Sequence, residues 1–389
     1  MSNTYKFNKS KMINTLIIIN LIVHIISKYN KKIIIHNKIS YISLKIIGPG
    51  YKKIFYEKDQ TCNSFSPPNE IYINDKNISI ISSSYMFNES VNDVKLIWNE
   101  KELFMNCLFY KCKDINEIDF SHFESIGKDI IHMFDGCTSL TSINLSNFNT
   151  SKVTKFDYLF NDCENLNSID LSSFDTFNIT SMRYMFTGCI SLNNINLSNF
   201  NTPKLSTTSH TFESCINLTS VDLSNFDLSE IGIMDFFFSN CTSLKIVKFP
   251  TSKTPKLVYI GSMFKYCESL ISVDLSNLNT SIVLNMDFMF YNCKSLTSFN
   301  LSNFDTSRVT WIESMFNGCS NLQYINLKNA IETPKEQYRY NNAFKGIPEN
   351  IVICINETNA PKLTQLIKQK DSSCYNIYCS DDWISHQKK

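Results

Sequence analysis

The spacing of eight cysteines constrains the fold of this chain more than any other feature of its sequence. They recur at a fixed interval of 26 residues: Cys137, Cys163, Cys189, Cys215, Cys241, Cys267, Cys293 and Cys319. A phenylalanine stands three residues before each cysteine and a leucine three residues after it, from Phe134 and Leu140 onward. A run this long in one register is typical of repeat proteins, whose units cannot bury their apolar side alone and therefore stack on one another.

Each unit contains two patterned segments. The segment 140–145 alternates apolar and polar residues toward its end, which predicts a short strand. The segment 153–160 spaces its apolar residues by three or four, which predicts a helical or 3-10 turn. We therefore expect an α/β repeat, a leucine-rich-repeat solenoid of 26-residue units. Its concave face would carry a parallel sheet and its convex face the short helical or 3-10 turns. One further column should stack as an inner spine: Phe148, Phe174, Phe200, Phe226, Leu278 and Phe304.

Two stretches of the array resemble a known family. GCTSLTSINLSNFNTSKVT at 136–154 and MFTGCISLNNINLSNFNT at 185–202 resemble BspA-type leucine-rich repeat surface proteins, and the resemblance covers roughly residues 86–330. It implies a microbial surface or secreted protein that acts as an adhesin toward host matrix or other cells. It implies no ligand-contacting residues, because the family has no fixed binding motif that can be placed on numbered positions here.

The chain divides into four predicted parts. Residues 1–30 contain an apolar run at 12–26 between lysines, which predicts a cleaved signal peptide, with an uncleaved signal anchor or a buried strand as alternatives. In 31–82, apolar residues alternate at Ile42, Leu44 and Ile46, and the turn residues from Asn74 follow a second strand-like run, so we predict an N-terminal β cap that contains a hairpin. The solenoid would occupy 83–345, including a degenerate turn around Met86 and Phe87. Residues 346–389 would form a C-terminal cap, where the off-register Cys354, Cys374 and Cys379 offer a possible disulfide of undetermined pairing.

The cysteine column is open to three interpretations. Its flanking Phe and Leu columns favour buried structural thiols that act as small hydrophobic side chains. Stacked rungs would bring successive cysteines close enough for disulfides, but each would have two equivalent neighbours and no unique partner. A metal ladder is the third interpretation, and the sequence lacks the CxxC and HExxH spacings typical of zinc sites. We predict no metal and no cofactor.

The outward strand positions are the candidate binding residues. We define the polar stripe as the candidate ligand-binding residues Asn144, Asp170, Asn196, Asp222, Asp274 and Asn300, and Lys248 and Asn326 share their column. The stripe could bind a ligand or cation, or it could be a solvated face on which Asn separates acids that would otherwise repel. Glycosylation sequons, which predict a glycoprotein if the chain is exported by a eukaryotic secretory route, recur at Asn77, Asn88, Asn144, Asn149, Asn178, Asn196, Asn217, Asn240, Asn279, Asn300 and Asn356.

Charge and motifs narrow the function. The formal net charge is +1, so no excess of basic residues favours nucleic acid. The six histidines follow no column, and no GxSxG, phosphate loop or dinucleotide motif is present, so we do not expect an enzyme. We predict a secreted or cell-surface adhesion protein that recognises a protein or glycan on another cell or matrix. It would touch a membrane only through an uncleaved N-terminal segment. The alternative is a coat or matrix protein assembled by solenoid packing.

Overall fold

The computed structural model describes residues 40–57, 62, 65–99, 103–123, 127, 129–332, 339–368 and 375–376. The repeats belong to the unit Tyr41–Lys389. The predicted signal segment at 12–26 lies outside the described residues. Within the described ranges, none of the helices has the length and apolar character needed to cross a bilayer.

An antiparallel module precedes the repeats. Its strands are β1 (Ser40–Ile47), β2 (Gly50–Lys53), β3 (Glu70–Ile73), β4 (Lys76–Ile78), β5 (Ser84–Phe87) and β6 (Val91–Trp98). The alternation predicted in β1 is confirmed, because Ile42, Leu44 and Ile46 are buried. The predicted hairpin is also confirmed: β3 and β4 pair around Asn74 and Asp75, both of which adopt positive φ.

The module extends further along the chain than the sequence indicated. Met86 and Phe87 pair with β2 as part of antiparallel β5, and are therefore not a degenerate repeat. The boundary predicted at residue 82 thus falls inside the module, whose last strand ends at Trp98. The sheet order β4-β3-β6-β1-β7-β8 shows that this module continues directly into the first repeats.

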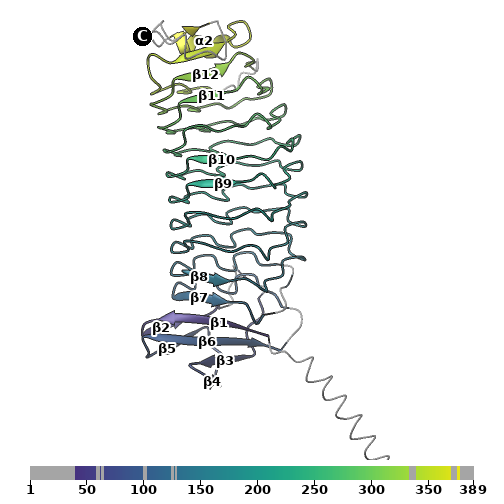
Figure 1. Ribbon diagram of the computed structural model, residues 1–389, viewed down its shortest axis with the longest axis vertical. Coiled ribbons are helices and arrows are strands. Elements are labelled where there is room, and N and C mark those ends of the chain that lie inside the picture. Colours follow the sequence, from purple (N-terminus) through teal and green to yellow (C-terminus); the bar gives the residue numbers. More distant parts are fainter. Residues whose placement is uncertain are drawn as a thin grey trace, which may run out of the picture. The chain divides into compact units, whose positions relative to one another are not determined.

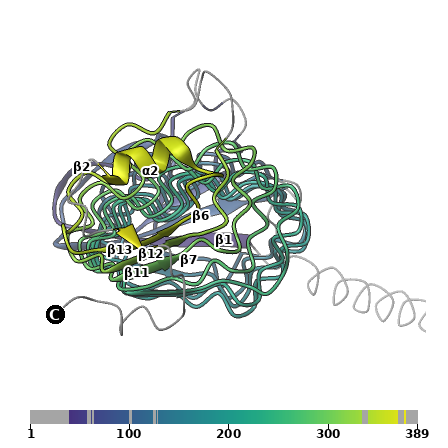
Figure 2. The ribbon, with the colours of Figure 1, turned by 90° about the horizontal axis from the view of Figure 1, so that it is seen from above.

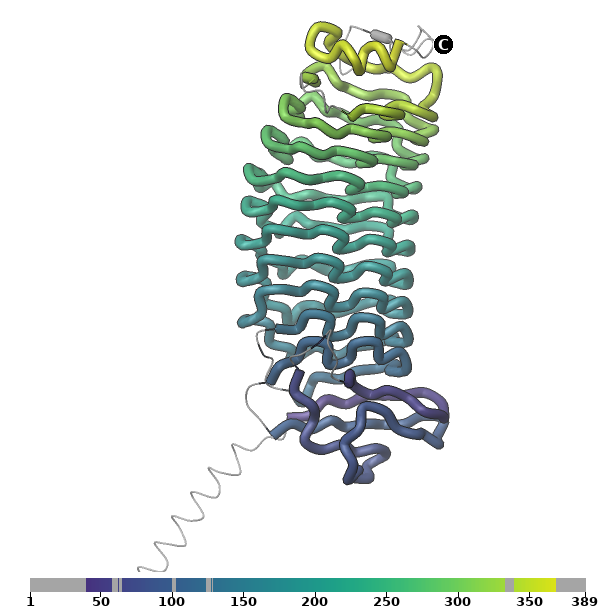
Figure 3. Tube along the Cα trace, turned by 180° about the vertical axis from the view of Figure 1, so that it is seen from behind, coloured from purple at the N-terminus to yellow at the C-terminus, as the bar shows by residue number. Residues whose placement is uncertain are grey.

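The repeats form a β-solenoid of about nine turns, which we call rungs. Its strands are β7 (Ile115–Asp119), β8 (Ser142–Asn144), β9 (Ser220–Asp222), β10 (Ile246–Lys248), β11 (Ser298–Asn300), β12 (Tyr324–Leu327), β13 (Val352–Ile355) and β14 (Tyr375–Asn376). These strands pair with one another in parallel, for example β9 with β10 and β11 with β12. Figure 1 shows the rungs stacked along one axis, Figure 2 shows β7, β11, β12 and β13 projecting onto the same side, and Figure 3 shows the stack from behind.

The α/β class and the helical turns predicted for the convex face are wrong. The only α-helix within the described residues, α2 (Pro361–Lys368), lies at the C-terminal end of the stack. In segment 153–160 alternate N–H groups donate to the next rung, as Phe156 does to the Ser181 carbonyl and Phe160 to the Met185 carbonyl. Each such segment also holds a residue at positive φ, such as Tyr158 at 57°. The Leu159 N–H does bond within the segment, to the Phe156 carbonyl oxygen at 3.2 Å, and closes a single turn. A right-handed helix requires negative φ and such bonds at successive residues, so the positive φ and the inter-rung bonds exclude one.

Phenylalanine rings form the centre of the core. The column that precedes the cysteines stacks almost face to face, with ring centroids 5.1 Å apart between Phe134 and Phe160 and 5.5 Å apart between Phe160 and Phe186. Stacking in the predicted inner spine is present as well, at 5.6 Å between Phe148 and Phe174 and 5.5 Å between Phe200 and Phe226. Stacked aromatic pairs contribute about 0.5–1.5 kcal/mol beyond their burial.

The cysteine column lies beside these rings. All eight thiols are free and buried. The Cys215 Sγ lies 3.1 Å from the Phe186 carbonyl oxygen of the preceding rung, and the equivalent distance for Cys241 and Phe212 is 2.9 Å. Each thiol therefore donates to a carbonyl that faces the core, and the same carbonyl also accepts the N–H of its own rung's cysteine. The position favours a small side chain that is apolar yet able to donate weakly, which describes cysteine.

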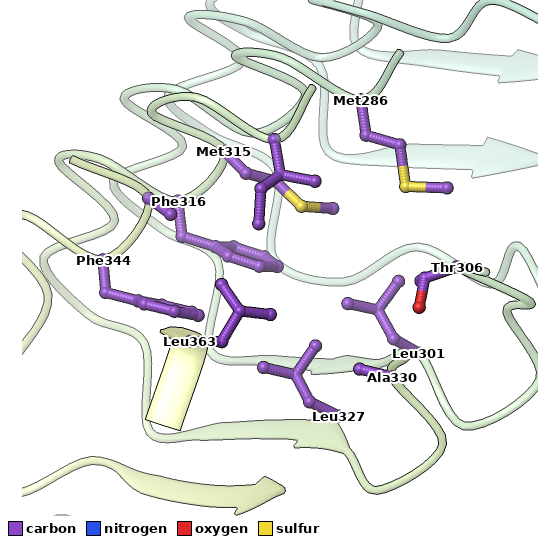
Figure 4. Close-up of a pocket in the computed structure, with 11 residues that line it drawn as sticks. Met286, Leu301, Thr306, Met315, Phe316, Leu327, Ala330, Phe344 and Leu363 are labelled. Carbon is purple, nitrogen blue, oxygen red and sulfur yellow. The ribbon is translucent and has the colours of Figure 1, made fainter. Parts of the chain in front are cut away.

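The C-terminal end of the inner spine carries a small residue. Ala330 occupies the position that Phe304 holds one rung earlier. Figure 4 shows Leu363, from α2, between Phe344 and Leu327 at a small apolar cavity of about 30 Å³, which Ala330 also lines. The helix thus contributes a leucine to the apolar core at this end of the stack.

Thiol chemistry tests the cysteine column. Burial raises the pKa of Cys112 and Cys319 to about 12 and raises that of the thiols between them as well. Because the thiolate is the reactive form, iodoacetamide at pH 8 should leave Cys137 to Cys319 unmodified in the native protein and should modify all of them in guanidinium chloride. Peptide mapping by mass spectrometry measures this. Rapid native labelling would show that the column is accessible.

Two neighbouring threonines provide a matched stability test. The Thr208 hydroxyl is buried without a hydrogen-bond partner within the described structure, whereas the Thr211 hydroxyl lies 2.8 Å from the carbonyl oxygens of Met182 and Thr208. Thr208→Val should raise the free energy of unfolding by about 1 kcal/mol, because it removes a buried unsatisfied group. Thr211→Val should lower it by about 1 kcal/mol. Urea unfolding measures both, and equal effects of the same sign would contradict the assignment.

Candidate ligand-binding site

The polar stripe lies on the outward side of the strands, and each member caps a turn. The side-chain oxygen of Asp170 accepts the N–H of Ser172 at 2.9 Å, and that of Asn196 accepts the N–H of Ser198 at 3.0 Å. The same bond forms at Asn144, Asp222, Asp274 and Asn300. Either Asn or Asp can make this bond, so the turn explains why the column holds only these two types apart from Lys248.

The turns also determine the charge of the stripe. Hydrogen bonds from the Ser224 hydroxyl and N–H, and then from Lys248, lower the pKa of Asp222 to about 2. The pKa of Asp170 is lowered mainly by the hydrogen bond from the N–H of Ser172. The pKa of Asp274 is lowered mainly by the hydrogen bond from the hydroxyl of Ser276. These three carboxylates therefore remain ionised throughout the range in which proteins are usually handled.

A second column of turns runs along the neighbouring corner. There Asn149, Asp175, Asp227, Asn279 and Asp305 accept the N–H two residues on. These residues share the turn chemistry of the stripe but lie after the spine phenylalanine rather than on the strand. They are a natural comparison set for the stripe.

A polar hollow lies where the antiparallel module meets the first rungs. Its volume is about 290 Å³, and its polar lining comes from Ser43, Lys45, Asp93, Glu117, Asp119, Ser142 and Asn144. The strand register explains why they converge. Ser43 of β1 stands opposite Asp119 of β7, which stands beside Asn144 of β8, while Lys45, Glu117 and Ser142 form a parallel row.

The polar hollow contains one ion pair and two further carboxylates. Lys45 Nζ lies 2.9 Å from Glu117 Oε2, an ion pair in which both side chains remain more than a third exposed. Asp119 accepts the N–H of Ser121 at 2.8 Å, in the same turn as the stripe. Asp93 adds a further carboxylate from β6. Of the predicted residues only Asn144 lines the hollow, and the others continue from it along the rungs.

Sequence reasoning missed most of the hollow, because its residues come from strands that are distant in the chain and only the register brings them together. It also missed the disulfide between Cys62 and Cys107, whose Cα atoms are 6.2 Å apart. Their signal was available, since neither belongs to the 26-residue series. Cys354 is buried and disulfide-bonded, while Cys374 and Cys379 lie outside the described residues.

Five of the sequon asparagines differ in how their side chains are bonded. Asn178 and Asn240 donate their side-chain amide N–H groups to Ser151 and Ser214, so a glycan there would replace an internal bond. Asn144, Asn196 and Asn300 engage through their side-chain oxygens as turn caps. Over the described residues, no group of three or more His, Cys, Asp and Glu side chains is arranged to hold a metal ion.

Comparison with known proteins identifies one family. A family model described as "Mycoplasma protein of unknown function, DUF285" matches residues 101–219, 128–249 and 238–348. No curated protein matches the chain. The three overlapping matches run without a gap across the cysteine repeats and cover more than half of the sequence. The chain therefore belongs to the DUF285 family.

Proposed function

We propose that this chain is a secreted or cell-surface binding module, of the adhesion type, that recognises a protein or glycan surface. The observation that carries the proposal is the polar face that begins in the hollow and continues along the polar stripe. It presents hydrogen-bonding side chains on a backbone held in place by inter-rung bonds. Its geometry suits many modest contacts spread over an extended ligand.

The regular placement of polar side chains on successive rungs supports this proposal. A rigid face loses little conformational entropy when it binds, so weak polar contacts on successive rungs can add up. Display of many copies would strengthen binding further through multivalency. The resemblance of the repeats to BspA-type leucine-rich repeats supports an adhesive role and an exported location, and both belong to the proposal.

Charge-neutralising substitutions test the proposed face. Asn can accept the same turn bond as Asp, so Asp119→Asn, Asp170→Asn and Asp274→Asn together should change the free energy of unfolding by less than about 0.5 kcal/mol. Asp222 is left in place because it pairs with Lys248. Binding to arrays of immobilised glycans and matrix proteins should weaken about tenfold, or about 1.4 kcal/mol. Wild-type binding should be constant from pH 5 to 8, because the stripe stays ionised.

The second column of turns supplies the matched control. Asp175→Asn, Asp227→Asn and Asp305→Asn remove the same charge from the same type of turn, and binding should be unchanged. Equal loss in both variants would mean that net charge, not this face, governs binding. Sedimentation velocity distinguishes the structural alternative: a monomer supports recognition, and concentration-dependent assembly supports a coat protein.

A further inference from the structure

A second parallel ladder runs along another side of the solenoid. It consists of single bridges that join equivalent residues of successive rungs: Lys155, Ser181, Thr207, Ile233, Tyr259, Asn285, Trp311 and Arg339. Its character changes along the stack. The first three positions are polar or charged, whereas the later ones include Ile233, Tyr259 and Trp311, none of them buried. Since the early rungs fold with polar residues at the same positions, the scaffold does not require aromatic side chains there.

The adjacent column becomes apolar over two of the same rungs. Thr154, Thr180, Ser206 and Gly232 are followed by Val258 and Leu284, which are only partly buried, and then by Thr310. Partly exposed apolar and aromatic side chains that gather in one region of a more polar face are typical of an interaction site.

The two aromatic rings of this surface stand two rungs apart, with Asn285 on the rung between them. Strand spacing places neighbouring rungs about 4.8 Å apart, so Tyr259 and Trp311 are separated by about 9.6 Å at the backbone. The Asn285 side chain leans toward Gly261, where a Cβ would lie only 2.9 Å from Asn285 Oδ1. It also accepts the N–H of Asp287 at 2.7 Å. Asn285 is thus held to one side, and we call the position between the two rings the Tyr259–Trp311 slot.

Acidic side chains border this slot. Asp287 lies on the rung of Asn285, and one of its oxygens accepts the Glu313 N–H at 2.6 Å. Asp235 lies two rungs earlier in the same column and accepts the Gly261 N–H at 2.7 Å. Burial is the main cause that raises the pKa of each carboxyl to about 6. A carboxylate that has lost hydration gains more from a cationic partner than an exposed one.

The chain itself shows which cation suits the ladder. The Arg339 guanidinium lies 5.8 Å from the Trp311 ring centre, on the next rung. A planar guanidinium stacks on aromatic rings and pairs with carboxylates better than an ammonium does. The carboxylates of Asp235, Asp287 and Glu313 outnumber the neighbouring cations Arg339 and Lys265, so the surface keeps an excess of negative charge.

We propose that the Tyr259–Trp311 slot binds an arginine side chain of a partner protein, with its guanidinium between the two rings and beside Asp287. This surface is separate from the polar stripe, and the inference does not rest on the proposed function.

Fluorescence anisotropy tests the inference with a labelled peptide of alternating arginine and glycine. Citrulline and lysine versions are the matched probes, since citrulline is planar but neutral and lysine is charged but not planar. The full chain should bind the arginine peptide about tenfold more tightly than either. Equal affinity for the arginine and lysine peptides would overturn the slot, because it would reveal charge attraction alone.

Substitutions locate the binding. Gly261→Ala should push Asn285 into the slot and reduce affinity about tenfold without altering any ring or charge. Gly232→Ala is its control, because a Cβ there meets nothing closer than 3.6 Å. Tyr259→Thr, which introduces the residue found at Thr207, and Asp287→Asn should each weaken binding severalfold. Circular dichroism verifies folding, and wild-type affinity in Gly261→Ala or Asp287→Asn would overturn the proposal.

The pH profile separates this site from the polar stripe. Affinity for the arginine peptide should fall as pH drops from 7.5 to 5, because Asp287 is protonated below about 6. Glu313 and Arg339 are the charged groups that face Asp287, and His210 faces Asp235. A flat profile would contradict the role of Asp287.

Discussion

Every rung of this solenoid must present to the next one the same surface that it receives from the previous one. Residues 26 positions apart lie next to each other in space, so an apolar column is satisfied only if nearly every rung contributes an apolar residue of similar shape. The stacked phenylalanines and the cysteine thiols bonded to the preceding rung's carbonyls are the result. A polar intruder such as Thr208 lies among apolar neighbours and finds no partner for its hydroxyl within the described structure.

The same stacking explains how polar residues are distributed. Each rung turns sharply, and its turns need side-chain acceptors, which Asn and Asp supply on two columns. These Asn and Asp side chains stabilise the turns of the solenoid. Any recognition by the strand face therefore uses groups that the turns have already fixed in position. The hollow between the antiparallel module and the first rungs differs, because Lys45, Asp93 and Glu117 have no equivalents in later rungs.

The sequence predicted the repeat, its period, the buried columns and the antiparallel module, because each leaves a periodic trace. The prediction of helical turns was wrong because the apolar spacing fits more than one backbone conformation. Apolar spacing of three or four residues in segment 153–160 fits a helix, but it also fits a turn in which Tyr158 adopts positive φ and alternate N–H groups bond to the next rung. Periodicity reports which side chains are buried and not where the backbone bonds go. The hollow depends on contacts between distant segments, which a single sequence does not display. For the Cys62–Cys107 disulfide the sequence shows only that both cysteines fall outside the 26-residue series, and not that they meet.

The end of the inner spine has a consequence for assembly. A column of phenylalanine rings that simply stopped would leave its last face exposed, and a second copy could continue it, giving an open-ended filament. In this chain Ala330 follows Phe304 in the column, and β13 pairs with β12 beyond it. Leu363 of α2 lines the apolar cavity at the same end. The chain's own strand and helix thus cover the face on which a second copy would have to stack.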